Sequence, residues 1–267
     1  MMRDRSTSLV RSLRIQLRVI GALLMREILT RYGRNNLGFL WVFVEPMIFT
    51  LGITALWTAT GLGHGSNMPI VAFALTGYSS VLLWRNMPNR CAMAIGPNIG
   101  LLHHRNVRVM DLFITRILLE FAGATVSFTV LASVFIVIGW MALPVDILTV
   151  RYGWLLLAWF GAALAMVIGA LTAYDEVVER FWHPAAYLLF PLSGAAFMLS
   201  WLPRNFRDLL LWLPMVNAVE MLRSGYFGDA IRTYFDVPYT VGSCMLLTLL
   251  GLALVRDAGR RVEGESR

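Results

Sequence analysis

The sequence predicts an all-helical (all-α) membrane protein with six transmembrane helices. Of its 267 residues, 58% are hydrophobic and 15% are charged, and the mean hydropathy is +0.65. A soluble domain is nearer half apolar and a quarter charged. The apolar residues also gather in long runs, and a run of roughly 20 residues can cross a bilayer as a helix. Composition and run length together indicate a polytopic membrane protein.

Six apolar segments form the predicted spans of one transmembrane domain, residues 37–267. The spans cover about 39–62, 69–95, 117–140, 152–172, 184–201 and 239–255. The second segment is clearly apolar only as far as Trp84, which is too short for a crossing, so its helix must continue through Arg85. In the first span Pro46 follows Glu45 and should kink the helix, because proline removes one backbone donor.

Residues 1–36 precede the first span, and residues 9–32 have the pattern of an amphipathic helix. Apolar residues recur at helical spacing on one face: Leu13, Leu17, Ile20 and Leu24. Arginines recur on another face: Arg11, Arg14 and Arg18. Such a helix can lie in the headgroup layer of the membrane with its apolar face down. The alternative is a basic flank that only sets the orientation of the first span.

Residues 203–238 differ from the other segments because they contain no run long enough to cross a membrane. Their two apolar patches, 209–213 and 215–222, are separated and flanked by proline and glycine. Patches of this length fit a re-entrant or interfacial structure. We therefore expect a helical hairpin at the periplasmic side before the last span.

The distribution of arginine predicts the orientation of the chain. Arginines concentrate in residues 1–34, 85–116 and 256–267. By the positive-inside rule these three parts are cytoplasmic. Six spans place both termini and the 85–116 link on that side, whereas five spans would not.

Polar and aromatic residues at membrane depth are the candidates for a substrate path. The sequence has no P-loop and no HExxH or GxSxG motif, so it predicts no catalytic residue and no nucleotide hydrolysis by this chain. Aromatic faces suit sugar rings, and ionisable residues inside a span should face protein or water. The path candidates are Trp41, Glu45, Phe49, Tyr78, Arg85, Tyr187 and Phe190. The alternative is that the aromatic residues only pack the helices or form interfacial belts.

Two further groups of polar residues lie outside the spans. Arg31 and Arg34 come just before the first span, where a guanidinium could bind the phosphate or carboxylate of a substrate headgroup. The same position equally suits arginines that only orient the helix. His103 and His104 are adjacent but have no carboxylate or cysteine nearby in sequence, so we expect a surface loop and no metal site.

Several stretches, taken together, carry a resemblance to a known family. Residues 31–34 stand ahead of Leu37-Gly38-Phe39-Leu40-Trp41, and Glu45-Pro46 follow in the first span. A long polar link follows the second span, and the hairpin before the last span contains Asn217, Arg223 and Gly228. In these features the chain resembles the permease subunit of type-2 ABC exporters, in the branch that exports capsular polysaccharide.

The resemblance implies a set of partners and a location. It implies a bacterial inner-membrane homodimer that works with two copies of a separate ATPase, which would bind ATP and Mg²⁺, while this chain needs no cofactor. It also implies a periplasmic bridging protein, an outer-membrane channel and a lipid-linked polysaccharide as substrate, with no nucleic acid. The link after the second span would dock on the ATPase through candidates in residues 98–108: Asn98, His103, His104, Arg105 and Arg108.

Other transport classes and a membrane enzyme stay open. The chain could be an ABC permease for O-antigen, teichoic acid or a small molecule. A secondary transporter would usually show internal repeats with matched broken helices, and the sequence shows no convincing repeat. A membrane enzyme would need clustered catalytic residues, whereas Glu45, Arg85 and Glu120 are scattered along the chain.

Overall fold

The computed structural model describes residues 9–32, 36–60, 69–102, 107–175 and 177–265. Every regular element in these ranges is helical, which agrees with the predicted class. The helices are α1 (Leu9–Tyr32), α2 (Asn36–Thr60), α3 (Ile70–Ala92), α4 (Ile99–Leu102), α5 (Val109–Val137), α6 (Ile147–Leu171), α7 (Val177–Leu192), α8 (Arg204–Leu210), α9 (Pro214–Phe227) and α10 (Val237–Glu265). Short 3₁₀ turns cover Gly96–Asn98, Leu199–Trp201 and Gly228–Ala230.

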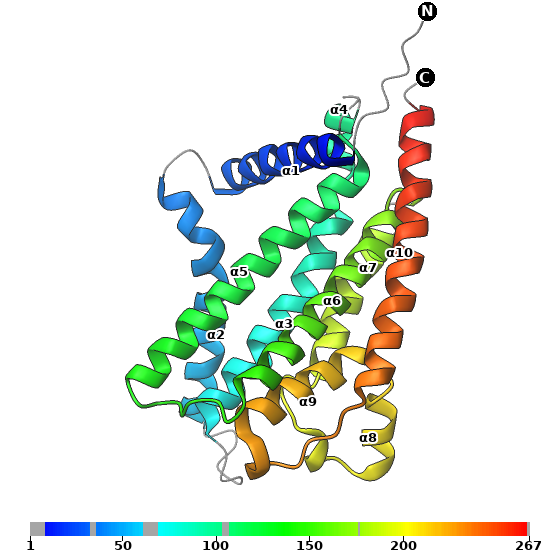
Figure 1. Cartoon of the computed structure of the whole chain (residues 1–267). Coiled ribbons are helices and arrows are strands. Elements are labelled where there is room, and N and C mark those ends of the chain that lie inside the picture. The colour runs from blue at the N-terminus through cyan, green and yellow to red at the C-terminus, as the bar shows by residue number, and fades with distance from the viewer. Residues whose placement is uncertain (1–8, 33–35, 61–68, 103–106, 176, 266–267) are drawn as a thin grey trace, which may run out of the picture.

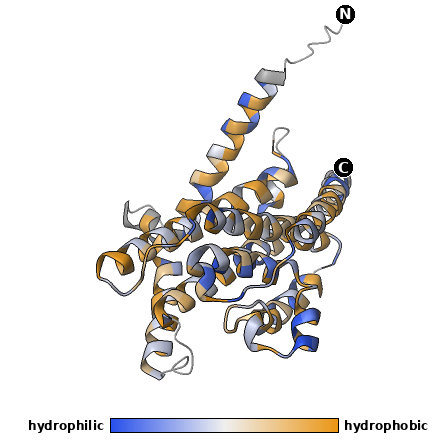
Figure 2. Cartoon of the chain, turned by 60° about the horizontal axis from the view of Figure 1, so that its bottom comes forward, coloured by the Kyte–Doolittle hydropathy of each residue, from blue (hydrophilic) through white to orange (hydrophobic). Residues whose placement is uncertain are grey.

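The long helices form one bundle that is closed at one end by α1 and at the other by α8 and α9. Figure 1 shows α1 lying across the end of the bundle to which the last turns of α10 also run. Figure 2 shows hydrophobic residues along the bundle, while hydrophilic residues interrupt the helix that leads to the N-terminus. On α1, Leu13 and Leu17 are exposed, so an apolar surface is available at this end of the bundle.

Four helices among the described residues are long and apolar enough to cross a membrane. They cover Leu40–Thr60, Val109–Val137, Ile147–Leu171 and Val237–Val262. The other two predicted spans correspond to α3 and α7, which fall short of that measure. α3 has 23 residues but carries polar side chains, and α7 has only 16 residues. The count of six spans therefore stays a prediction.

α3 is the central helix of the bundle, which explains its polar composition. It packs against α2, α5, α6, α7 and α9, and most of its residues are buried. The buried hydroxyls of Thr76 and Ser80 donate back to carbonyls of their own helix, at 2.8 Å to Ala72 and 2.6 Å to Thr76. A helix that is surrounded by protein does not need the apolar surface that lipid requires, so its mean hydropathy is low.

Close helix contacts depend on glycine at a few positions of α6. A Cβ atom at Gly161 would lie 2.9 Å from the Cα of Trp84 on α3, and one at Gly153 would lie 2.6 Å from the amide nitrogen of Leu222 on α9. Real Cβ atoms do not approach other atoms this closely, so the two helices can meet α6 only where no side chain intervenes. α6 itself begins at Asp146, whose carboxylate accepts bonds from Leu148 and Thr149. The bond from Thr149 is the main reason that the pKa of Asp146 lies below its usual value.

Two helices differ in their bounds from the predicted spans. α5 begins at Val109, not near 117, because Asp111 caps the helix by accepting a 2.9 Å bond from the backbone nitrogen of Arg108. α7 covers Val177–Leu192 and not 184–201, and the chain turns after it at Gly194, where φ is +80°. Residues 203–238 contain α8 and α9, as a helical hairpin requires, and their depth in a membrane stays a prediction.

Candidate functional site

A network of ion pairs joins three helices at the end of the bundle that α1 covers. Arg31 of α1 contacts Glu120 of α5 at 2.6 Å and Glu27 of its own helix at 2.8 Å. Arg90 of α3 contacts Glu120 at 3.2 Å, and Arg116 of α5 contacts Glu27 at 3.3 Å. The side chains of Glu27, Arg31, Arg116 and Glu120 are only 11–16% exposed. We call these four residues and Arg90 the ionic network.

The ionic network fixes α1 against the bundle. Buried charges are tolerated only when they are paired and hydrogen-bonded, so each carboxylate here holds its arginines in place. Two more contacts also attach α1 to the bundle: Arg26 donates a 2.7 Å hydrogen bond to Asn98, and Gln16 donates one to Asp111. α1 is therefore attached to α5 and to the link after α3 by polar contacts, in addition to packing.

Glu45 belongs to the edge of this network. Its carboxylate lies 3.8 Å from Arg90, and both side chains are partly exposed. This contact gives Glu45 a protein partner on α3, and its role in a substrate path stays a prediction. The guanidinium of Arg31 donates hydrogen bonds to two carboxylates, those of Glu27 and Glu120. Its role in binding the substrate headgroup at the entry stays a prediction. Arg34 lies outside the described residues.

Four of the predicted path residues come together between α3 and α7. The guanidinium carbon of Arg85 lies 5.4 Å from the centre of the Tyr187 ring. The rings of Tyr78 and Phe190 meet edge to face, with their centres 6.2 Å apart. Arg85 has one buried nitrogen, Nε, without a hydrogen-bond partner among the described residues. We call these four residues the Arg85 cluster.

The path candidates on α2 lie apart from the Arg85 cluster. Trp41 and Phe49 are about half exposed, and neither makes a ring contact with another described residue. They therefore present aromatic surface on the outside of the helical bundle. Their role in lining a substrate path stays a prediction.

The candidate docking link is described only at its two ends. Asn98 is buried: its amide donates to Ala94 at 2.9 Å and its oxygen accepts the bond from Arg26. Arg108 is exposed at the start of α5. His103, His104 and Arg105 lie outside the described residues, so the docking role of the link stays a prediction.

α9 carries buried polar residues whose role the sequence did not reveal. Arg223 is fully buried, donates to the carbonyls of Gly194, Ala195 and Phe197 at 2.6–2.9 Å, and lies 4.2 Å from the centre of the Phe73 ring. Glu220 accepts backbone bonds from Leu199 and Tyr234. These side chains form hydrogen bonds with backbone groups in the segments before and after α9, which a pattern of sequence spacing could not show.

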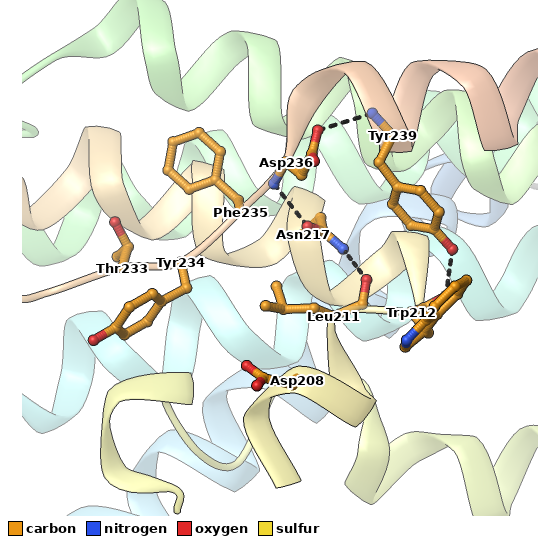
Figure 3. A pocket seen from close by; sticks show the side chains of 9 residues that line it. All are labelled: Asp208, Leu211, Trp212, Asn217, Thr233, Tyr234, Phe235, Asp236 and Tyr239. Atoms are coloured by element: carbon orange, nitrogen blue, oxygen red, sulfur yellow. Dashed lines mark hydrogen bonds between the residues drawn. The ribbon is translucent and has the colours of Figure 1, made fainter. Parts of the chain in front are cut away.

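A cavity of about 630 Å³ opens beside α9, at the end of the bundle opposite α1. Figure 3 shows its lining, which comes from α8, α9, the loops on either side of α9, and the start of α10. Its residues are Asp208, Leu211, Trp212, Asn217, Thr233, Tyr234, Phe235, Asp236 and Tyr239. Asn217 holds the wall together, because it accepts a 2.8 Å bond from the backbone of Asp236 and donates one to Leu211. Aromatic rings beside carboxylates suit the faces and hydroxyls of a sugar.

The chain is similar to known transport proteins over most of its length. The family model described as ABC-2 type transporter matches residues 18–227. The chain is 45% identical to the capsule polysaccharide export inner-membrane protein CtrC of Neisseria meningitidis serogroup A, over 96% of this chain and 97% of that protein. It is 42% identical to BexB of Haemophilus influenzae, which has the same descriptive name, with the same coverage. It is 26% identical to the polysialic acid transport protein KpsM of Escherichia coli, over 91% of this chain and 94% of that protein.

Proposed function

This chain belongs to the ABC-2 type transporter family, and we propose that it is the transmembrane permease of an ATP-driven exporter of capsular polysaccharide. The observation that carries this proposal is 42–45% identity, over 96% of the chain, to proteins named for capsule polysaccharide export at the inner membrane. The helical bundle with several membrane-length helices supports the same function. The chain accordingly resides in a bacterial inner membrane, with both termini in the cytoplasm.

The exporter is completed by partner subunits. The sequence has no P-loop, so ATP and Mg²⁺ bind on two copies of a separate ATPase. A second copy of this chain forms the other half of the membrane pore, and the exposed apolar face of α2 that carries Trp41 and Phe49 is available to line it. A periplasmic protein then bridges to an outer-membrane channel, as the resemblance to capsule exporters implies.

The Arg85 cluster is the proposed contact for the sugar chain. A guanidinium at membrane depth is costly unless it has a function or a partner, and Arg85 has an aromatic ring on one side and an unpaired buried nitrogen. Tyrosine rings offer flat faces to sugars and hydroxyls to their oxygens. An arginine in the same place attracts the carboxylates of an acidic polymer.

The ionic network is the proposed coupling element. The link between α3 and α5 docks on the ATPase, and its described end is attached to α1 through the bond between Arg26 and Asn98. A movement of the link therefore reaches α1, and through Glu27, Arg31 and Glu120 it reaches α5. Paired buried charges resist separation, so the connected helices move together.

Deletion of the gene and complementation test the proposed function. In the source bacterium, deletion should remove polysaccharide from the cell surface and leave lipid-linked polymer inside the cell. A plasmid copy of this chain should restore surface polymer, and a copy with the link residues 98–108 deleted should not. Normal surface polymer in the deletion strain, together with loss of resistance to a small exported compound, would assign the permease to another substrate.

A further inference from the structure

A second cavity, of about 370 Å³, lies at the end of the bundle that α1 covers. It opens between the start of α5 and the last turns of α10, two helices that contact each other. One wall comes from the segment that leads into α5: Leu102, Val107, Arg108, Val109 and Met110. The other wall is α10: Leu252, Val255, Arg256, Gly259, Arg260 and Val262.

The lining combines three guanidinium groups with apolar side chains. Arg256 and Arg260 are four residues apart on α10, so they lie on the same side of the helix, and Arg108 stands on the opposite wall. Among the residues whose side chains the structure describes, which end at Val262, none forms an ion pair with any of the three. The neighbouring Asp257 bonds instead to Tyr174 at 2.5 Å, and Asp111 bonds to the backbone of Arg108 and to Gln16. The cavity therefore has positive charge that the described protein does not neutralise.

The cavity lies where the apolar part of α10 gives way to a charged stretch, at the last turns of the candidate span Val237–Val262. On the approach to it, α10 exposes large apolar side chains such as Leu246, Leu249 and Leu250. The apolar sequence ends at Val255, and Arg256 begins a charged stretch. Basic pockets between transmembrane helices at this level are suited to anionic lipid headgroups, because arginine binds phosphate oxygens in a bidentate manner.

We propose that this cavity binds the phosphodiester headgroup of an anionic lipid. The three arginines hold the phosphate, and the apolar residues on both walls contact the glycerol and the upper part of the acyl chains. Two sources have this chemistry: a phospholipid of the surrounding membrane, and the lipid anchor of the exported polymer. The first requires only that the chain resides in a membrane, and the second also rests on the proposed export function.

The binding test compares two triple variants that lose the same charge. Purified protein in neutral detergent is titrated with phosphatidylglycerol and, separately, with phosphatidylcholine, and bound lipid is counted by native mass spectrometry. Arg108→Gln, Arg256→Gln and Arg260→Gln together should weaken phosphatidylglycerol binding at least tenfold. The control changes exposed arginines at the opposite end, Arg151, Arg204 and Arg232, to Gln and should bind as the parent does. The proposal is overturned if parent and cavity variant bind phosphatidylglycerol equally and also retain the lipid-linked polymer equally, or if both triple variants lose binding to the same extent.

A cavity-filling variant keeps all three arginines, so it tests the site without the loss of charge that could also impair folding. A Cβ atom at Gly259 meets nothing within 4 Å, and the same holds for Gly242 on the same helix outside the cavity. Gly259→Leu should fill the cavity and lower phosphatidylglycerol binding at least tenfold, whereas Gly242→Leu should not change it. Unchanged binding in Gly259→Leu contradicts the proposal.

Two further measurements identify the source of the lipid and test whether the arginines bind a protein instead. Phosphatidylglycerol bound at the cavity indicates a membrane lipid, and retention there of only the lipid-linked polymer from export-deficient cells indicates the substrate anchor. Either result supports the phosphodiester site. Variants that bind both lipids normally but lose the ATPase subunit would show that the arginines meet a protein, which would overturn the lipid proposal. Because the lipid arm needs no export, its failure is distinguishable from failure of the proposed function.

Discussion

Glu120 is the residue on which the ionic network depends most. It accepts contacts from Arg31 and Arg90, which come from two different helices, while its own side chain is 11% exposed. The sequence drew attention to Arg31 and Glu45 because charges next to or inside a span are unusual. It could not pair Arg31 with Glu120, because 89 residues separate them and no local pattern records a contact between helices.

Neutralising Glu120 should destabilise the protein much more than neutralising an exposed acid. Glu120→Gln leaves Arg31 and Arg90 without their shared carboxylate, and breaking a buried pair costs about 3–5 kcal/mol. Asp208→Asn is the matched control, because its pairs with Arg204 and Arg207 are 3.8 Å long and exposed surface pairs contribute about 0–1 kcal/mol. Thermal unfolding in detergent measures both. Equal unfolding temperatures for the two variants would show that the network does not hold α1 in place.

The Arg85 cluster gives a second test at the residue scale. Tyr187→Ala removes the ring under Arg85, and a cation–π contact is worth about 0.5–2 kcal/mol, so export should fall about two- to thirtyfold. Tyr187→Phe keeps the ring and should export nearly as the parent does. Leu188→Ala, an exposed neighbour on α7, is the control for truncation alone. The measurement is the rate at which polymer reaches the cell surface, and equal rates for Tyr187→Ala and Leu188→Ala would remove Tyr187 from the path.

At the scale of elements, the sequence predicted the helices whose ends are set by local signals. The long apolar runs located α2, α6 and α10 to within a few residues, apart from the charged extension of α10. The start of α5 and the bounds of α7 differ from the predicted spans. The Asp111 cap is a local contact with Arg108 that a search for apolar runs does not detect, and the turn at Gly194 ends α7 earlier than the apolar run suggests. α3 looked like a marginal span because its polar residues are covered by other helices and not by lipid.

The contact between α6 and α9 is an element-scale feature that a single methyl group can test. A Cβ at Gly153 would lie 2.6 Å from the amide nitrogen of Leu222, so Gly153→Ala must push α9 away at a cost of about 1–3 kcal/mol. Gly52→Ala on α2 meets nothing within 4 Å and should be neutral or gain up to about 1 kcal/mol in helix propensity. The comparison is made by thermal unfolding and by the yield of protein extracted from membranes. Equal behaviour of the two variants would contradict this close contact.

At the scale of the whole molecule, the orientation of the chain in the membrane stays a prediction. Asp229 lies beside α9 and Asp175 lies between α6 and α7, and both are exposed. The two native cysteines, Cys91 and Cys244, are buried, so introduced cysteines can be labelled over a low background. In intact spheroplasts an impermeant thiol reagent should label Asp229→Cys, and should label Asp175→Cys only after permeabilisation. The reverse pattern would invert the assigned topology.

In the proposed function, this chain carries a lipid-linked polymer across the membrane by using ATP that a partner hydrolyses. The most direct measurement uses vesicles that contain this chain and its ATPase with the cytoplasmic face outward. With ATP and Mg²⁺, labelled lipid-linked polymer added outside should become protected from an added glycosidase. Protection should be absent without ATP, without this chain, or with an ATPase that cannot hydrolyse ATP. Polymer that stays fully accessible while ATP is hydrolysed at the normal rate would contradict the account.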